Sequence, residues 1–360
     1  MQFGMDESLS MIRCLTEAKG PSGFEDEAVA AARAHARGNL DVTEDTLRNL
    51  YLRRRENRPG RPVVMLDAHT DEVGFMVQAV RPNGTLKFIP LGGWVNSNIP
   101  AHRVWVRSRK GQWIPGITAA KPPHFMSAAE RNTMPEIADM SIDIGASSPE
   151  EVRDVFGIGP GAPVVPDVDF RYDREHDLIT AKAMDNRLGC CLVLEVLAAL
   201  EGEDLPVQVV GALASQEEVG TRGASVTARQ VKPDVALVFE GSPADDTVVE
   251  DWLSQTRLRH GPMLRHMDAR MITHPRFQRF ALNTAERLGI PVQEAVRTGG
   301  STNGAPIHLS ENGIPCVVIG LPVRYIHSHY GIACLSDYLN ARELGIQLIR
   351  SLTEDVIGNF

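Results

Sequence analysis

The feature of this sequence that most constrains its fold is a regular alternation of strand and helix patterns in its second half. From residue 167 onwards, runs of apolar and β-branched residues typical of buried strands are separated by segments with apolar residues at helical spacing. The predicted strands are 206–214, 234–240 and 314–320, and the predicted helices are 187–201, 219–229, 275–288, 305–312 and 336–352. Strand–helix alternation of this kind predicts an α/β fold with a largely parallel sheet.

A stretch of different character comes before this region. Residues 61–69 (RPVVMLDAH) form a predicted buried strand, preceded by the predicted helices 6–18 and 25–37. Short strands broken by Gly, Pro and Asn then follow at the spacing of a small β-barrel or sandwich. They are 73–80, 86–90 and 103–108, followed by a strand and short helix within 141–157 and a Pro- and Gly-rich return linker at 158–170. We therefore predict a discontinuous α/β domain, residues 1–71 and 167–360, carrying an inserted β-domain at 72–166.

The composition excludes several classes of protein. The formal net charge is −9 at pH 7, whereas nucleic-acid binding depends on clustered Lys and Arg, so we expect no nucleic-acid partner. No stretch approaches the ~20 apolar residues that cross a bilayer, so we expect no membrane association. The five cysteines form no CxxC pair. This odd number is typical of reduced thiols, and with an N-terminus unlike a signal peptide it predicts a cytoplasmic protein.

Charged side chains and histidines gather where the predicted strands end. Each of the four strands at 61–69, 206–214, 234–240 and 314–320 ends in or is followed by such residues, and one more carboxylate precedes the helix 187–201. In chain order they are His69, Asp71, Asp185, Glu217, Glu218, Glu240 and His327. Because ligands of open α/β sheets bind outside the carboxyl ends of the strands, neighbouring strands would bring these side chains together.

Such a cluster predicts bound metal. Each residue alone has an ordinary structural explanation, but several buried carboxylates repel one another, and divalent cations are the simplest way to hold them together. Two histidines and at least three carboxylates exceed the three protein ligands of one catalytic zinc. Nitrogen and oxygen ligands without thiolate suit zinc, cobalt or manganese, and a carboxylate bridging two ions ~3.5–4 Å apart would account for the surplus.

Two short patterns suggest how the roles are divided. The His69-x-Asp71 spacing fits a carboxylate that receives the second N–H of a ligating imidazole. In the pair Glu217–Glu218, adjacent side chains point in different directions, so one can bind metal while the other acts as a base.

Six motifs spread over most of the chain carry a resemblance to a known family. They are LDAHTDEVGFMV (66–77), ITAAKPPH (117–124), IDIGASS (142–148), AKAMDNRLG (181–189), SQEEVGTRGA (215–224) and PVRYIHS (322–328). In this order they resemble the tetrahedral (TET-type) dinuclear aminopeptidases, metallopeptidase family forty-two, which includes glutamyl and leucyl aminopeptidases.

The resemblance implies a role for each candidate. It implies two divalent cations per chain, zinc first, and Asp71 as a supporting catalytic residue. Glu217 falls on the general base of the family. The implied metal ligands are His69, Asp185 as the bridge, Glu218, Glu240 and His327.

This chain departs from the family pattern at three positions. Glu240 stands where Asp is common, which could alter the spacing of the metals. His329 stands where Pro usually follows the HS pair, so it is a possible rival of His327. Asn303 stands where Asp is frequent in a Gly-rich segment, here TGGSTNGA (298–305).

The implied function is hydrolysis of the N-terminal residue from short peptides through a water that bridges the metals. The resemblance also implies that residues 72–166 mediate dimerisation and that dimers assemble into a tetrahedral dodecamer. Three alternatives compete with this function. The first is an N-acyl amino acid deacylase, with Arg222 or Arg324 binding the substrate carboxylate. The second is a non-catalytic metal-binding scaffold subunit, and the third a glycosidase, which would leave the histidines without a role.

Overall fold

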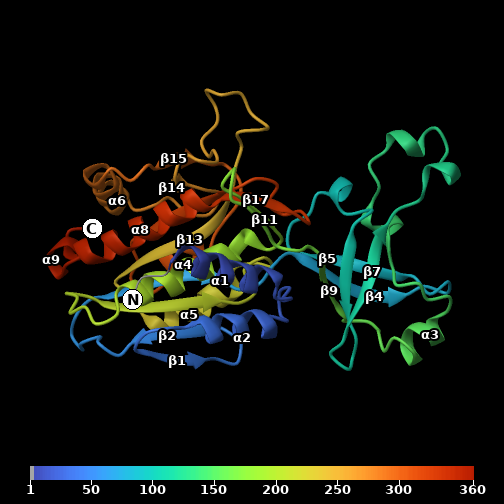
Figure 1. Ribbon diagram of the computed structural model, residues 1–360, viewed down its shortest axis with the longest axis horizontal. Coiled ribbons are helices and arrows are strands. Elements are labelled where there is room, and N and C mark those ends of the chain that lie inside the picture. Colours follow the sequence, from blue (N-terminus) through green and yellow to red (C-terminus); the bar gives the residue numbers. More distant parts are fainter. Residues whose placement is uncertain (1–3) are drawn as a thin grey trace.

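A large mixed sheet forms the centre of the molecule, and a small barrel projects from it (Figure 1). The computed structural model describes residues 4–360. The sheet has eight strands in the order β1-β2-β12-β3-β13-β16-β14-β15. Their bounds are β1 (Leu40–Glu44), β2 (Leu50–Arg54), β3 (Val63–His69), β12 (Gln208–Ala214), β13 (Val235–Pro243), β14 (Met263–Met267), β15 (Gln293–Val296) and β16 (Cys316–Val323).

The four predicted strands are neighbours in the middle of this sheet. β12, β3, β13 and β16 run parallel, with His69 opposite Ala214 and Glu240 opposite Gly320. The α/β class predicted from the sequence is therefore confirmed. The sheet is extended by antiparallel pairing of β2 with β12 and of β14 with β16, and β1 and β15 form its edges. The sequence does not predict these four outer strands.

Helices cover both faces of the sheet, which explains the continuous apolar runs of its central strands. In β3, Val64 and Leu66 pack on one face and Met65 on the other, and full burial of one such side chain contributes ~1.5–3 kcal/mol. The first face carries α1 (Met5–Glu17), α2 (Asp26–His35), α4 (Met184–Ala199), α6 (Pro275–Leu288) and α8 (Leu335–Ser351). The second face carries α5 (Arg222–Val231) and α7 (Gly304–His308).

The inserted segment closes into a barrel with its own apolar core, which includes Phe75, Phe88 and Val104. The strand order is β4-β5-β8-β7-β6-β9. Their bounds are β4 (Gly74–Val80), β5 (Leu86–Leu91), β6 (Arg103–Arg107), β7 (Trp113–Ala119), β8 (Ser141–Asp143) and β9 (Pro163–Pro166). The connections between the barrel strands contain four short helical turns and one helix. They are η1 (Asn96–Asn98), η2 (Pro123–Phe125), η3 (Glu130–Asn132), η4 (Ile137–Asp139) and α3 (Pro149–Asp154).

One prediction in this region was wrong. Residues 158–170 were predicted to be a return linker, but β9 within them closes the barrel by pairing with β4 and β6. Of the three prolines in this segment, Pro160 precedes the strand, and Pro163 and Pro166 stand at its ends, where proline is tolerated. Val164 between them pairs with Phe75 and Val106.

A separate, smaller sheet has three strands. It consists of β10 (Arg171–Asp173), β11 (Leu178–Ala181) and β17 (Gly331–Cys334). Helix α9 (Glu354–Gly358) ends the chain. Among the helices within residues 4–360, none is long and apolar enough to span a membrane.

Candidate metal centre

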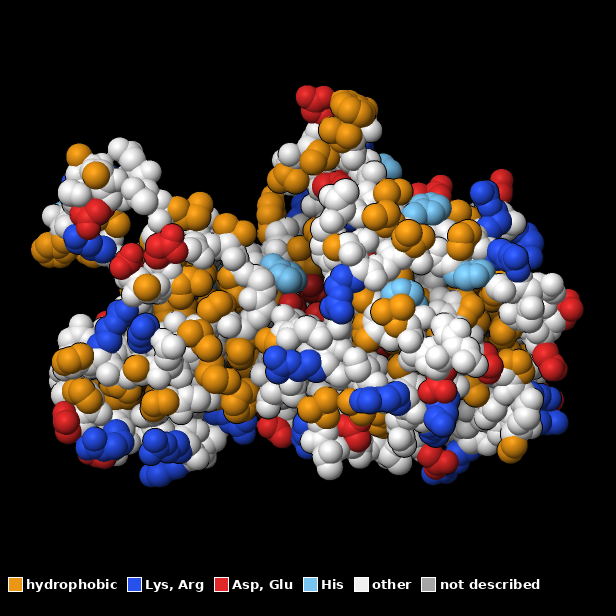
Figure 2. Space-filling view, turned by 180° about the vertical axis from the view of Figure 1, so that it is seen from behind, with side chains coloured by type: hydrophobic (Ala, Val, Ile, Leu, Met, Phe, Trp, Pro, Cys, Tyr) orange, Lys and Arg blue, Asp and Glu red, His pale blue; other side chains and the backbone are white. Residues whose placement is uncertain are grey.

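The carboxyl ends of the central strands place most of the predicted residues side by side. His69 is the last residue of β3, and Glu240 lies within β13. Glu217 and Glu218 follow β12, and His327 follows β16 after a short loop. Figure 2 shows histidine and acidic side chains at the notch between the barrel and the larger part of the molecule.

Asp185 reaches the same place from the irregular start of α4. It has non-helical dihedrals, φ −86° and ψ 106°, and its peptide bond to Asn186 is cis. The amide of Asn186 donates a hydrogen bond of 2.8 Å to the carbonyl oxygen of Phe239 on β13. A Cβ atom at Gly241 would lie 2.8 Å from Cα of Asp185, so glycine is needed for this close approach.

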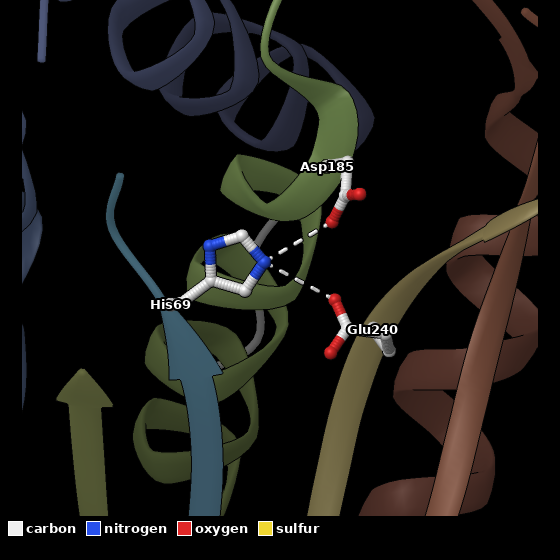
Figure 3. A group of neighbouring side chains, drawn as sticks. All are labelled: His69, Asp185 and Glu240. Carbon is white, nitrogen blue, oxygen red and sulfur yellow. Dashed lines mark hydrogen bonds and ion pairs between the residues drawn. The ribbon is translucent and has the colours of Figure 1, made fainter. Parts of the chain in front are cut away.

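The side chains form two groups of three that share Asp185. We call His69, Asp185 and Glu240 the inner triad, and Asp185, Glu218 and His327 the outer triad. In the inner triad, Nε2 of His69 lies 3.1 Å from Oδ1 of Asp185 and 3.3 Å from Oε1 of Glu240 (Figure 3). In the outer triad, Nε2 of His327 lies 3.3 Å from Oδ2 of Asp185 and 3.5 Å from Oε2 of Glu218. The two carboxylate oxygens of Asp185 therefore face different triads.

The chemistry of this cluster fits bound divalent cations. Oε1 of Glu218 and Oε2 of Glu240 are buried without a hydrogen-bond partner among the described residues. Burial raises the pKa of Glu240 to about 8, and the charge of Asp185 adds to the effect. Burial lowers the pKa of His327, but Glu218 and Asp185 outweigh it and raise that pKa to about 10. Uncompensated negative charge thus favours protonation of these groups, and cations at the triads would compensate it instead.

Asp71 links the inner triad to the Glu217–Glu218 turn. Its backbone carbonyl accepts a hydrogen bond from Nδ1 of His69 at 3.1 Å, and its Oδ1 lies 3.3 Å from the same nitrogen. Donation from Nδ1 leaves Nε2 of His69 free to bind a cation. The Asp71 carboxylate also accepts hydrogen bonds from Ser22 Oγ at 2.6 Å and from the backbone nitrogens of Glu217 and Glu218 at 2.9 and 3.1 Å.

Glu217 lines the cleft beside the triads without belonging to either. Burial raises the pKa of its carboxyl to about 8, and the nearby charges of Glu240, Asp71 and Asp185 act in the same direction. A carboxylate with a raised pKa next to a cation site has the properties of a general base.

His327 and His329 lie in different surroundings. His327 has a φ of 58°, and its Nδ1 donates a hydrogen bond of 2.9 Å to the carbonyl oxygen of Gly93. His329 is fully buried and belongs to neither triad. Its Nε2 lies 3.3 Å from the carbonyl oxygen of Ile99, and burial lowers its pKa to about 3.

A cleft of about 720 Å³ opens beside the outer triad. The residues that line it include Arg265, Arg270 and Arg297, which come from β14 and from loops. No motif or strand-end position marks these three arginines, so they could not be predicted from the sequence. A protruding loop tipped with hydrophobic side chains stands above this region (Figure 2).

Three residues discussed from the sequence lie outside the cleft lining. Arg324 makes two hydrogen bonds of 2.9 and 2.7 Å to Asp246, and Arg222 is exposed with Nη1 3.4 Å from Gln216 Oε1. Asn303 is fully buried. Neither arginine is therefore placed to bind a substrate carboxylate, as the deacylase alternative requires.

Comparison with known proteins gives a consistent result. The sequence model of the M42 glutamyl aminopeptidase family matches residues 49–344. The glutamyl aminopeptidase of Lactococcus lactis subsp. cremoris (strain MG1363) is 33% identical over 353 residues, covering 98% of each chain. The crystal structure of a TET aminopeptidase from Thaumarchaeota archaeon SCGC AB-539-E09 superposes with a TM-score of 0.93 at 38% identity, covering 98% of this chain and 99% of that chain.

A further solved structure extends the likeness to a protein of known assembly. Pyrococcus horikoshii TET1 peptidase, described as assembling into a tetrahedron or a large octahedral shell, matches with a TM-score of 0.85 at 25% identity, covering 96% of this chain and 100% of that chain. None of these matches favours the deacylase or scaffold alternatives. The chain therefore belongs to the M42 glutamyl aminopeptidase family of metal-dependent hydrolases, as its motifs predict.

Proposed function

We propose that this protein is a dinuclear metallo-aminopeptidase that removes the N-terminal residue from short peptides. The observation that carries the proposal is the pair of triads sharing Asp185, whose Oδ1 and Oδ2 face His69 and His327 respectively. A carboxylate shared in this way is the arrangement expected of a residue that bridges two cations. The proposed ligands are therefore His69, Asp185, Glu218, Glu240 and His327.

Glu240 is compatible with this role although Asp is common at its position. Its Oε1 already lies 3.3 Å from Nε2 of His69, while its Oε2 has no partner among the described residues. The longer side chain of Glu240 therefore reaches the inner triad from β13.

The reaction would be divided between cations and protein groups. Two divalent cations, of which zinc is the first expectation and cobalt or manganese the alternatives, would supply Lewis acidity to the scissile carbonyl and to the attacking water. Glu217 would accept the proton of that water and return it to the leaving amine. Asp71 would hold the His69 ring and the Glu217 backbone in place.

The cleft supports a small peptide substrate. Its volume of about 720 Å³ lies beside the outer triad and Glu217, within the range typical of ligand pockets. The relative from Lactococcus is named a glutamyl aminopeptidase, which supports a free N-terminal residue as the group removed.

The protein is further proposed to be a cytoplasmic homo-oligomer, with the barrel segment 72–166 as the main contact region. The tetrahedral and octahedral assemblies named for Pyrococcus horikoshii TET1 peptidase support self-association, and a tetrahedral dodecamer is the expected form. The exposed Phe125 within the barrel segment, 73% accessible, is consistent with a contact surface there. Five free cysteines are consistent with a reducing compartment.

The decisive experiment is to strip the metal and reconstitute the protein with zinc, cobalt or manganese. Aminoacyl anilides, N-acetyl amino acids and the bound ions per chain should be measured on the same samples. We expect two ions per chain at saturation, activity on the anilides and none on the N-acetyl compounds. Full activity with one ion or none would contradict the dinuclear proposal, and faster cleavage of N-acetyl amino acids would contradict the aminopeptidase assignment.

A further inference from the structure

We propose that the inserted barrel is part of the outer cation site, and that His329 is a positioning residue that holds the barrel against the loop carrying His327. This inference rests on the proposed function, because it concerns the affinity of one of the two cation sites. It assigns a role to a histidine that the metal centre itself does not use.

The barrel contacts the outer triad directly. Gly93, in the loop between β5 and β6, accepts the hydrogen bond from Nδ1 of His327 at 2.9 Å. A Cβ atom at Gly93 would lie 3.1 Å from that same nitrogen, and one at Gly92 would lie 3.1 Å from Oε2 of Glu218. Two members of the outer triad therefore pack directly against this barrel loop.

The inner triad lacks such support. Among residues 4–360, the hydrogen bonds and ion pairs of His69 and Glu240 run to one another and to the α/β part of the chain. The side chain of His69 is 1% exposed, whereas that of His327 is 39% exposed. The outer ligand is therefore the more accessible one, and the barrel carbonyl is what fixes its ring.

Contacts between aromatic rings hold the barrel against the segment that carries His327. His329 stacks on His102 of the barrel with ring centroids 4.1 Å apart and an interplanar angle of 28°. The ring centroid of His329 also lies 5.0 Å from that of Trp94, and Trp94 stacks on Phe75 with centroids 4.6 Å apart. We call His329, His102, Trp94 and Phe75 the aromatic clamp. Trp94 directly follows Gly93, so the clamp and the carbonyl that orients His327 are adjacent in the chain.

A hydrogen bond also connects Trp94 of the clamp to the first strand of the barrel. Nε1 of Trp94 donates a hydrogen bond of 3.1 Å to the carbonyl oxygen of Gly74 at the start of β4. His329 follows His327 by two residues, so one short segment carries both the cation ligand and the clamp ring. Loosening the clamp should let the Gly93 carbonyl move away from His327, while the inner triad stays intact.

The test is a calorimetric titration of Co²⁺ into metal-stripped protein. The variants are His329→Ala, which empties the clamp, His329→Phe, which keeps a stacking ring, and His102→Ala, which removes the barrel side of the stack. His327→Ala serves as the reference for loss of the outer ion, and Lys87→Ala, an exposed change on β5, is the matched control. Melting of the metal-free proteins reports on folding.

We expect His329→Ala to weaken the second ion by the ~10–100-fold typical of groups that orient a ligand, and to leave the first ion unchanged. His102→Ala should shift the second ion in the same direction, and His329→Phe should restore its affinity. If His329→Ala fails to fold, the affinities of His102→Ala and His329→Phe for the second ion still test the inference.

Two results would overturn the inference. One is a His329→Ala titration identical to that of Lys87→Ala, and the other is equal weakening of both ions. A parent protein that binds fewer than two ions would instead contradict the proposed function, so the two failures can be told apart.

Discussion

Oδ1 of Asp71 lies 2.9 Å from the backbone nitrogen of Glu217 and 3.3 Å from Nδ1 of His69. One buried carboxylate thus fixes both a proposed cation ligand and the backbone of the proposed base. His69 and Asp71 are neighbours in the sequence, whereas Glu217 is distant, and the parallel pairing of β3 with β12 brings it to them.

We predict that Asp71→Asn lowers both cation affinity and turnover by ~10–100-fold. Asparagine keeps the size of the side chain, but its amide nitrogen is a donor and cannot replace a carboxylate oxygen that accepts hydrogen bonds. The two oxygens of Asp71 together accept from Ser22, Glu217 and Glu218. Calorimetry and steady-state kinetics would measure the two effects. Ser22→Ala, which removes one of these hydrogen bonds, should have a smaller effect; equal losses in both variants would argue against a linking role for Asp71.

Glu217→Gln should lower turnover by the ~10²–10⁴-fold typical of a lost general base while both ions still bind. The reason is that Glu217 lines the cleft but belongs to neither triad. Glu218→Gln should instead weaken the outer ion and lose activity that excess metal partly restores. Ion counts and kcat on the two variants test this, and exchanged phenotypes would show that the adjacent glutamates have been assigned in the wrong order.

The sequence predicts the centre of the fold well, for a physical reason. Parallel strands covered on both faces are continuous apolar runs, and their carboxyl ends meet at one edge. Hence His69 at the end of β3 and Glu240 on β13 could be placed at that edge from the sequence alone. The position of Asp185 was predicted only as lying before a helix, because its orientation depends on Asn186 bonding to Phe239.

What could not be predicted depends on contacts between distant segments. The edge strands β1 and β15 are short and partly exposed, so their sequences lack an apolar run. The Gly93 carbonyl that orients His327 is a backbone group and leaves no mark on residue type. His329 could be noticed as unusual, but only the fold shows that it stacks on His102.

Glu25 should make the protein less stable as the pH rises towards neutral. Burial, with the charge of Asp71, raises the pKa of its carboxyl from 4.5 to about 7. The folded state therefore holds this proton more tightly than the unfolded chain. The contribution of protonated Glu25 to the free energy of unfolding is fully present below pH 4.5 and is lost as the pH rises through 7.

Glu25→Gln removes this titration. The difference in free energy of unfolding between Glu25→Gln and the parent should increase from pH 4.5 to above 7, by up to about 3 kcal/mol. Urea unfolding at a series of pH values measures it. Glu286→Gln, an exposed change on α6, is the control and should give a flat profile; a flat profile for Glu25→Gln would contradict the prediction.

The wall of the cleft predicts a preference for acidic N-terminal residues. Arg265 pairs with Asp268 at 3.1 Å and Arg297 with Asp245 at 3.4 Å. The side chain of Arg270, by contrast, makes no hydrogen bond or ion pair within residues 4–360 and lines the same cleft. A substrate carboxylate there would meet a positive charge that no protein group already neutralises.

Glutamyl and aspartyl anilides should therefore be cleaved with a higher kcat/KM than lysyl anilide. Arg270→Glu replaces attraction by repulsion, and because each partly exposed charge pair is worth up to ~1 kcal/mol, the ratio of the two kcat/KM values should fall roughly tenfold. Arg270→Gln should give an intermediate ratio. Arg229→Glu, an exposed change on α5, controls for net charge and should leave the ratio unchanged. A parent enzyme that prefers lysyl anilide, or a ratio unaffected by Arg270→Glu, would show that this wall does not contact the N-terminal side chain.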